Sequence, residues 1–186
     1  QDAHMLLRRL PVYAAPVPAE GIVKLGLDLP DPAAALENLL AFSLLEVSEN
    51  REYETLEYQV EPSLHAYLLE KNLLDASPRA KNAAADYLLW LMEHERNTYP
   101  HLALTIEALR RADRHSEADR LTLDLLVGKY TRDGRYAELL ARWLPEARNS
   151  PDRKTQAEAI GQTGKLHIHI GDYETALTYL KQSLDI

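Results

Sequence analysis

A short segment recurs near the end of the chain. GRYAELL begins at Gly134 and GDYETAL begins at Gly171, 37 residues later. Each copy follows one amphipathic helical pattern and opens another, which marks two helix–turn–helix units of one kind. In the second unit we expect a close helix approach at Gly164 and docking of the last helix at Ala176, beside an apolar stripe of Tyr173, Leu177, Leu180 and Leu184. A unit of this kind can bury its apolar face only by packing against a neighbouring unit. The segment therefore favours stacked antiparallel helix hairpins.

The pattern extends this architecture back to residue 76. Residues 76–186 are predicted to hold six helices in three pairs, with Ser77-Pro78 and Ser150-Pro151 each placing a cap before a proline that starts a helix. The first pair is a looser hairpin. Trp90 and Trp143 lie on apolar stripes and are expected in the core. If the array is cut at Ile186, its apolar edge would be able to drive homo-oligomers.

Residues 5–75 have a different organisation. Apolar spacings of three and four predict three short helices, the third opened by Asp31-Pro32. Residues 44–49 and 53–60 then alternate with a period of two, which is typical of two strands. The polar segment SENRE between them forms the predicted hairpin tip, and a helix follows from Pro62. We therefore expect a mainly α protein with one small β-hairpin.

Composition excludes several classes of protein. The 186 residues include no cysteine, so disulfides, thiol catalysis and cysteine zinc sites are absent. No run of about 18 apolar residues predicts a membrane span, and we expect a cytoplasmic protein. The first residues, QDAHM, resemble a vector junction, so whether residues 1–5 are native stays open. Residues 1–75 hold 5 Lys and Arg against 13 Asp and Glu, whereas residues 76–186 hold 16 of each, so the whole net charge of −8 lies in the first part.

Candidate chemical motifs fail on inspection. GQTGKL at 161–166 has two residues between its glycines, where a phosphate-binding loop needs four, and Leu166 stands where Ser or Thr is required. His167 and His169 are two residues apart, which on a helix sends them to opposite sides. No set of nucleophile, base and orienting residue is recognisable. We predict no catalytic residue, cofactor or metal ligand in this segment.

The N-terminal pattern resembles a known family. The order of three helices, a hairpin and a helix is that of a winged helix. The segment also resembles the winged-helix part of the STAND signal-transduction ATPases, which include the NB-ARC proteins, through Leu36, Leu39, Leu40, Ser43, Leu44, Leu45 and Glu46. Glu61 stands where that family usually has a histidine that contacts bound ADP. A carboxylate there would repel the nucleotide, so the resemblance implies no nucleotide-sensing role for Glu61.

The recurring hairpins resemble tetratricopeptide repeats, which bind proteins. The resemblance places the inner, ligand-facing positions of the last repeat at Glu158, Gly161, Lys165, Ile168 and His169. In the middle repeat it places them near Asp124, Gly128, Thr131 and Arg132. Lys165, Arg132 and His169 would then hold a carboxylate or acidic side chains of a peptide. The alternative, that so short an array has no ligand of its own, stays open.

Three functions follow from these patterns. The first is a non-catalytic regulatory fragment of a larger signalling NTPase, in which residues 5–75 form a winged helix that contacts the intramolecular ATPase domain and residues 76–186 sense a protein or peptide. The second is a winged-helix transcription regulator with a tetratricopeptide sensor. The acidic character of residues 1–75 disfavours this regulator, because DNA binding needs Lys and Arg side chains that neutralise phosphates. The third is a plain scaffold. The identity of the ligand is open in each.

Overall fold

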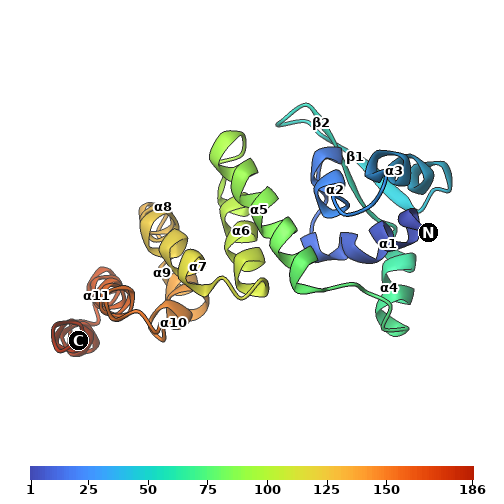
Figure 1. Cartoon of the computed structure of the whole chain (residues 1–186). Helices are drawn as coiled ribbons and strands as arrows, with labels where there is room; N and C mark the ends of the chain where they lie inside the picture. Colours follow the sequence, from blue (N-terminus) through green and yellow to red (C-terminus); the bar gives the residue numbers. More distant parts are fainter. The chain divides into compact units, whose positions relative to one another are not determined.

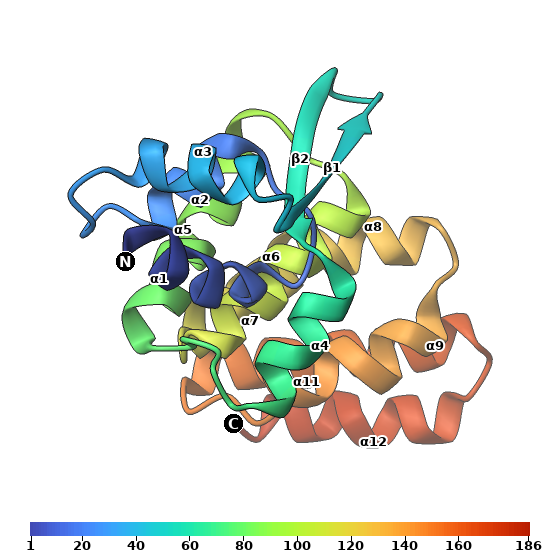
Figure 2. The ribbon, with the colours of Figure 1, turned by 90° about the vertical axis from the view of Figure 1, so that its right-hand side faces the viewer.

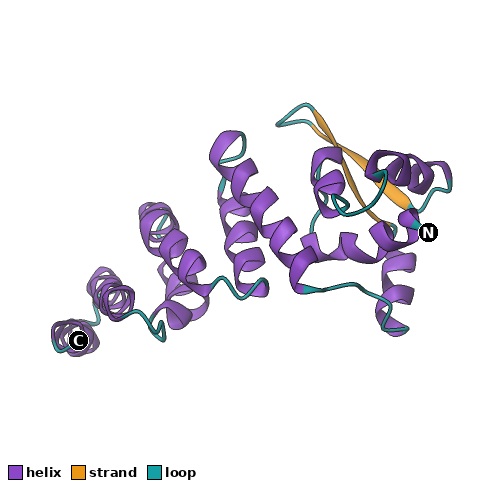
Figure 3. Cartoon of the chain, in the orientation of Figure 1, coloured by secondary structure: helices purple, strands orange, loops and turns teal.

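The computed structural model describes all 186 residues and divides them into two compact units. One unit comprises Gln1–Glu93 and the other His94–Ile186. The protein is mainly helical with one small antiparallel sheet, which lies in the first unit (Figures 1 and 3). None of its helices has both the length and the apolar character that crossing a membrane requires.

Four short helical segments begin the N-terminal unit. They are α1 (Asp2–Arg9), the 3-10 turn η1 (Leu10–Tyr13), α2 (Ala19–Leu25) and α3 (Pro32–Ala41). As the sequence predicts, Asp31 caps α3: its side chain accepts a hydrogen bond from the backbone N–H of Ala34 at 2.9 Å, and proline occupies the first helical position. The buried side chains of these helices form the core of the unit, among them Leu6, Leu10, Tyr13, Ile22 and Leu39.

The two predicted strands are confirmed. β1 (Leu45–Asn50) pairs antiparallel with β2 (Thr55–Val60), from Leu45 opposite Val60 to Asn50 opposite Thr55. Leu45 and Val60 are buried at the base of the hairpin, while its far end extends beyond the helices (Figure 2). A single bridge joins Val17 to Tyr58, with backbone hydrogen bonds of 2.8 and 3.0 Å in the two directions. The segment between η1 and α2 is therefore held against β2 at one residue, while the sheet itself has two strands.

Two helices follow the hairpin, α4 (Pro62–Glu70) and α5 (Pro78–His94). Glu61 caps α4, because its carboxylate accepts hydrogen bonds from the N–H groups of Ser63 and Leu64 at 3.1 and 2.8 Å. The hydrogen bond from the Ser63 hydroxyl, followed by those from the two backbone N–H groups, lowers the pKa of Glu61. This carboxylate thus has a structural role that starts a helix.

A buried arginine joins three parts of the N-terminal unit. Arg9, in α1, is almost fully buried and makes ion pairs with Asp28 at 2.6 Å and with Asp75 at 2.9 Å. Asp28 lies in the loop after α2, and Asp75 lies between α4 and α5. The guanidinium also donates a hydrogen bond to the carbonyl of Leu25 at 3.0 Å. Because a buried charge without partners is costly, these acceptors fix the positions of both loops.

We expect Asp28→Asn to weaken the N-terminal unit in a pH-dependent way. Hydrogen bonding to Arg9 holds the pKa of Asp28 below its ordinary value. A carboxyl group with a lowered folded-state pKa stabilises the protein above its unfolded pKa of about 3.9 and loses that contribution as pH falls through the folded pKa. The variant should therefore lose about 1–2 kcal/mol of unfolding free energy at pH 7.

Urea denaturation followed by circular dichroism at a series of pH values measures this difference. The gap between wild type and variant should narrow below about pH 4, where the wild-type carboxylate takes up its proton. Asp31→Asn is the control, because asparagine also caps helices. An equal gap at pH 7 and pH 3 would show that the ion pair is not the cause.

Helix α5 lies in the N-terminal unit, whereas the sequence analysis placed it with the repeats after residue 76. The reason is its contact with α2. A Cβ atom added at Gly21 would lie 2.5 Å from Cε1 of Tyr87, so the ring of Tyr87 packs directly on the α2 backbone. Tyr13 meets Tyr87 edge to face, with ring centroids 6.1 Å apart. Because α5 packs on α2 in this way, the N-terminal unit extends to Glu93.

The C-terminal unit consists of helices alone. It contains α6 (Tyr99–Arg111), α7 (His115–Leu121), η2 (Thr122–Leu126), α8 (Val127–Arg132), α9 (Tyr136–Glu138), η3 (Leu139–Trp143), α10 (Leu144–Ala147), α11 (Arg153–His169) and α12 (Tyr173–Leu184). The segments α7, η2 and α8 follow one another directly, as do α9, η3 and α10, so each set forms one predicted helix. Trp143 is buried as predicted and meets Tyr130 edge to face at 6.5 Å.

Both η2 and η3 are π-helical turns, which the sequence analysis did not predict. The N–H of Val127 bonds to the carbonyl of Thr122, and the N–H of Leu144 bonds to the carbonyl of Leu139, each five residues back. Pro145 gives a reason for η3, because a proline has no N–H to donate and its ring crowds the carbonyl four residues earlier. We have no corresponding explanation for η2.

The last hairpin is closed by small residues, as the sequence predicts. Helices α11 and α12 run side by side (Figure 2). A Cβ atom added at Gly164 would lie 2.8 Å from Cγ of Leu180 and 3.1 Å from the carbonyl oxygen of Ala176. Asp172 caps α12 by accepting a hydrogen bond from the N–H of Thr175 at 3.2 Å. Gly171, in the turn, has a φ of +83°, which favours glycine.

Gly164→Ala should therefore destabilise the C-terminal unit. The methyl group must push apart α11 and α12, and overpacking of this kind costs about 1–3 kcal/mol, less the gain in helix propensity of about 1 kcal/mol. Gly128→Ala in α8 is the matched control, since nothing lies within 4 Å of its added Cβ. It should stabilise by about 0.5–1 kcal/mol. The midpoint temperatures of thermal unfolding of the two variants test this prediction. Equal shifts in both variants would contradict the close approach of the helices at Gly164.

Candidate protein-interaction surface

Four predicted binding residues share one face of α11. Glu158, Lys165, Ile168 and His169 are all exposed, and their spacing of three, four or seven residues places them along one side of the helix. Gly161 lies on the same side and is partly covered by Ser183 of α12, whose hydroxyl would be 3.2 Å from an added Cβ. The face therefore offers a carboxylate, an ammonium group, an imidazole and one exposed apolar side chain to solvent.

The other two predicted residues lie on the preceding hairpin. Asp124 is in η2 and Arg132 ends α8, and both are exposed. Neither side chain forms a hydrogen bond or ion pair with the α11 face. The two hairpins are instead joined by a ring stack that the sequence analysis missed: Tyr136 lies parallel to His169, with centroids 5.3 Å apart and an interplanar angle of 8°.

The signal for this stack was present in the sequence. Tyr136 is the third residue of the first recurring segment, and Tyr173 occupies the same position in the second. Tyr136 is covered by the imidazole of the next hairpin, whereas Tyr173 is 70% exposed. The recurring tyrosine therefore marks the position at which one hairpin receives a ring from the next.

A second aromatic cluster lies at the turn of the last hairpin. The ring of His167 stacks on Tyr179 at 5.5 Å, and its Nδ1 is 3.3 Å from a carboxylate oxygen of Asp172. Arg148 donates a hydrogen bond to the hydroxyl of Tyr179 at 2.9 Å. Hydrogen bonds from Thr175, with a smaller contribution from His167, lower the pKa of Asp172. His167 thus packs between α11 and α12.

The outer face of α12 is apolar and open. Tyr173, Leu177 and Leu184 are 70%, 54% and 86% exposed. Their counterparts 37 residues earlier are Tyr136, Leu140 and Ala147, of which the first two are partly covered and the third is fully buried. Positions covered in one hairpin are thus exposed in the next, which leaves a contiguous apolar stripe. Contiguous exposed apolar surface commonly marks an interaction site.

No group of three or more His, Asp and Glu side chains is arranged to hold a metal ion. Trp90, which the sequence placed in the core, is 44% exposed, so that prediction is wrong.

A search for related proteins found no family model, curated protein or solved structure that matches this chain.

Proposed function

We propose that this chain is a regulatory and protein-interaction part of a larger signalling NTPase. In this proposal the helix hairpins of the second unit bind a protein or peptide, and the first unit relays the resulting change to an ATPase domain. Such a relay needs a ligand that prefers one of two conformations. The observation that carries the proposal is the presence, in one chain, of a winged-helix-like order of elements and a recurring helix hairpin.

Support for a winged helix comes from the order α1, Val17, α2, α3, β1, β2. The Val17–Tyr58 bridge places an extended residue beside β2 between the first and second helices, where winged helices commonly have a strand. Support for tetratricopeptide-like repeats comes from the close packing of Gly164 against Leu180 and from the 37-residue recurrence. On this basis Lys165, His169 and Arg132 are the proposed contacts for acidic groups of a ligand.

A transcription regulator is the alternative that shares the same order of elements. In DNA-binding winged helices the third helix or the wing meets the duplex. Here α3 has the sequence PAAALENLLA, without Lys or Arg. The wing carries one basic residue, Arg51, against the acidic residues Glu46, Glu49, Glu52, Glu54 and Glu57. Neither element could neutralise phosphates, so the alternative is disfavoured.

We expect no DNA binding. A fluorescein-labelled random duplex of about 30 base pairs, titrated at 50 and 200 mM salt, should show no saturable anisotropy change up to about 100 µM protein, whereas DNA-binding proteins bind even non-specific DNA at about 1–100 µM. Tight binding that weakens steeply with salt would favour the regulator.

The gene itself tests the signalling proposal. A larger NTPase of this kind should encode a phosphate-binding loop about 200–300 residues before this segment, on ordinary domain sizes. The isolated chain should show no ATP turnover. A complete reading frame without that loop would overturn the proposal.

We also propose that the outer face of α12 mediates self-association. Sedimentation at tens of micromolar should detect oligomers that dissociate in Leu177→Lys, because a buried lysine would replace about 1.5–3 kcal/mol of leucine burial. Leu56→Lys on the β-hairpin is the matched control, since Leu56 is also 54% exposed. A wild-type chain that sediments as a monomer at this concentration would contradict the proposed self-association.

A further inference from the structure

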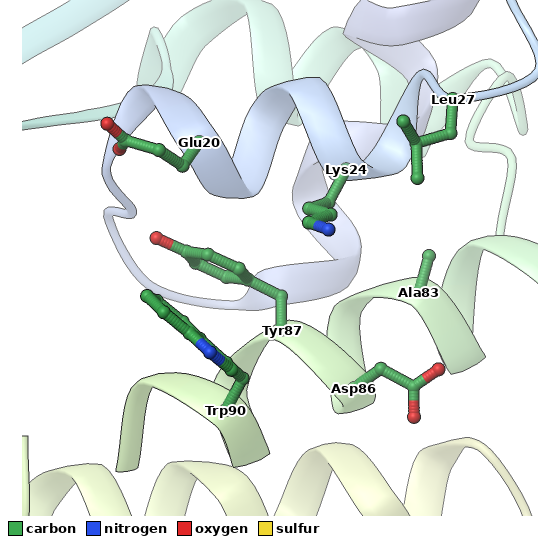
Figure 4. Close-up of a pocket in the computed structure, with 7 residues that line it drawn as sticks. All are labelled: Glu20, Lys24, Leu27, Ala83, Asp86, Tyr87 and Trp90. Carbon is green, nitrogen blue, oxygen red and sulfur yellow. The ribbon is translucent and has the colours of Figure 1, made fainter. Parts of the chain in front are cut away.

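A groove of about 560 Å³ lies between α2 and α5 of the N-terminal unit (Figure 4). Glu20, Lys24 and Leu27 line it from α2 and the loop that follows, and Asp86, Tyr87 and Trp90 line it from α5. Glu20, Lys24 and Leu27 are three, four or seven positions apart, and Trp90 lies three and four positions after Tyr87 and Asp86, so one side of each helical segment faces the groove. None of them belongs to the hairpin surface of the proposed function, so this site is tested independently.

The floor of the groove is closely packed. Tyr87 packs on the backbone of Gly21 and makes an edge-to-face contact with Tyr13. The hydroxyl of Tyr13 donates a hydrogen bond to the carbonyl of Gly21 at 2.7 Å, and burial raises the pKa of that hydroxyl well above its ordinary value. The groove is therefore preformed, which lowers the entropic cost of binding.

The surface of the groove is suited to apolar side chains. Trp90 stacks on Tyr87 with ring centroids 6.0 Å apart and remains 44% exposed. Leu27, near the other end in Figure 4, is 64% exposed. Concave sites lined by apolar and aromatic side chains commonly bind ligands, and Trp is among the residues enriched at the energetic centres of interfaces.

The charge of the unit defines the partner further. Residues 1–93 hold 7 Lys and Arg against 15 Asp and Glu, a net charge of −8, while residues 94–186 are balanced at 14 of each. At the groove itself Glu20 contributes a carboxylate on the α2 side, near one end of the site. The field of the unit attracts a basic partner and repels an acidic one.

We propose that this groove binds the apolar face of a basic amphipathic helix from a partner protein. A groove between two helical segments matches the anchors that such a helix presents at positions i, i+3 or i+4, and i+7. Leucine or aromatic anchors lie against Trp90 and Tyr87, and Lys or Arg side chains flank them near Glu20. A small apolar molecule or a second copy of the chain are the competing occupants.

Selection from a phage-displayed library of random 16-residue helical peptides tests the proposal. The peptides selected on the intact chain should combine apolar anchors at helical spacing with a net positive charge. A synthetic, fluorescein-labelled copy of the best peptide is then titrated by polarisation. Leu27→Asp should weaken its binding about tenfold or more, since it removes a buried apolar contact and adds an unpaired charge.

Leu69→Asp in α4 is the matched control. Leu69 is 63% exposed and lies outside the groove, so its substitution should leave peptide binding unchanged. Glu20→Lys should weaken a basic peptide about two- to fivefold, as expected for an exposed charge pair. Failure to select peptides, selection of acidic peptides, or equal effects of Leu27→Asp and Leu69→Asp would overturn the proposal. If unlabelled chain, added in excess, displaced the peptide by occupying the groove itself, the groove would belong to a second copy. That result would also overturn the proposal.

Discussion

The buried guanidinium of Arg9 is the interaction on which the N-terminal unit most depends. It ties helix α1 to the loop after α2 through Asp28 and to the segment before α5 through Asp75. These two loops set where α2 ends and where α5 starts. The groove between α2 and α5 is therefore framed by an ion-pair network that does not itself line it. A buried pair of this kind adds little net stability, but it penalises any arrangement that leaves the arginine unpaired.

Both units bring helices together by the same means. In the first unit Gly21 lets Tyr87 approach the α2 backbone, and in the second Gly164 lets Leu180 and the Ala176 carbonyl approach α11. The absence of a side chain at one position allows a large side chain on the partner helix to pack against backbone. The glycine thereby sets where along each helix pair the large side chain packs against backbone.

Sequence patterns predicted the local structure well. The cap at Asp31, the two strands, the close approach at Gly164 and the buried Trp143 all follow from spacing and residue type. The patterns failed where tertiary contacts decide. Trp90 lies on an apolar stripe like Trp143, but periodicity says only which side of a helix is apolar and not how much of it a neighbour covers.

The same limit applies to the candidate sites. Spacing put Lys165 and His169 on one face of α11, yet the stack of His169 on Tyr136 depends on how two hairpins meet. The groove beside Trp90 combines residues more than 60 positions apart in sequence, so no local pattern could assemble it. The π turn before Pro145 was in principle readable from that proline, because its missing N–H disturbs the preceding turn.

The uneven distribution of charge has a consequence for how copies of the chain meet. One unit carries the entire net charge of −8 and the other is neutral. At low ionic strength two molecules therefore repel each other through their N-terminal units and approach most readily through their C-terminal ones. Added salt shortens this repulsion to within about 8–10 Å, so it would remove the orientational preference while leaving apolar contacts intact.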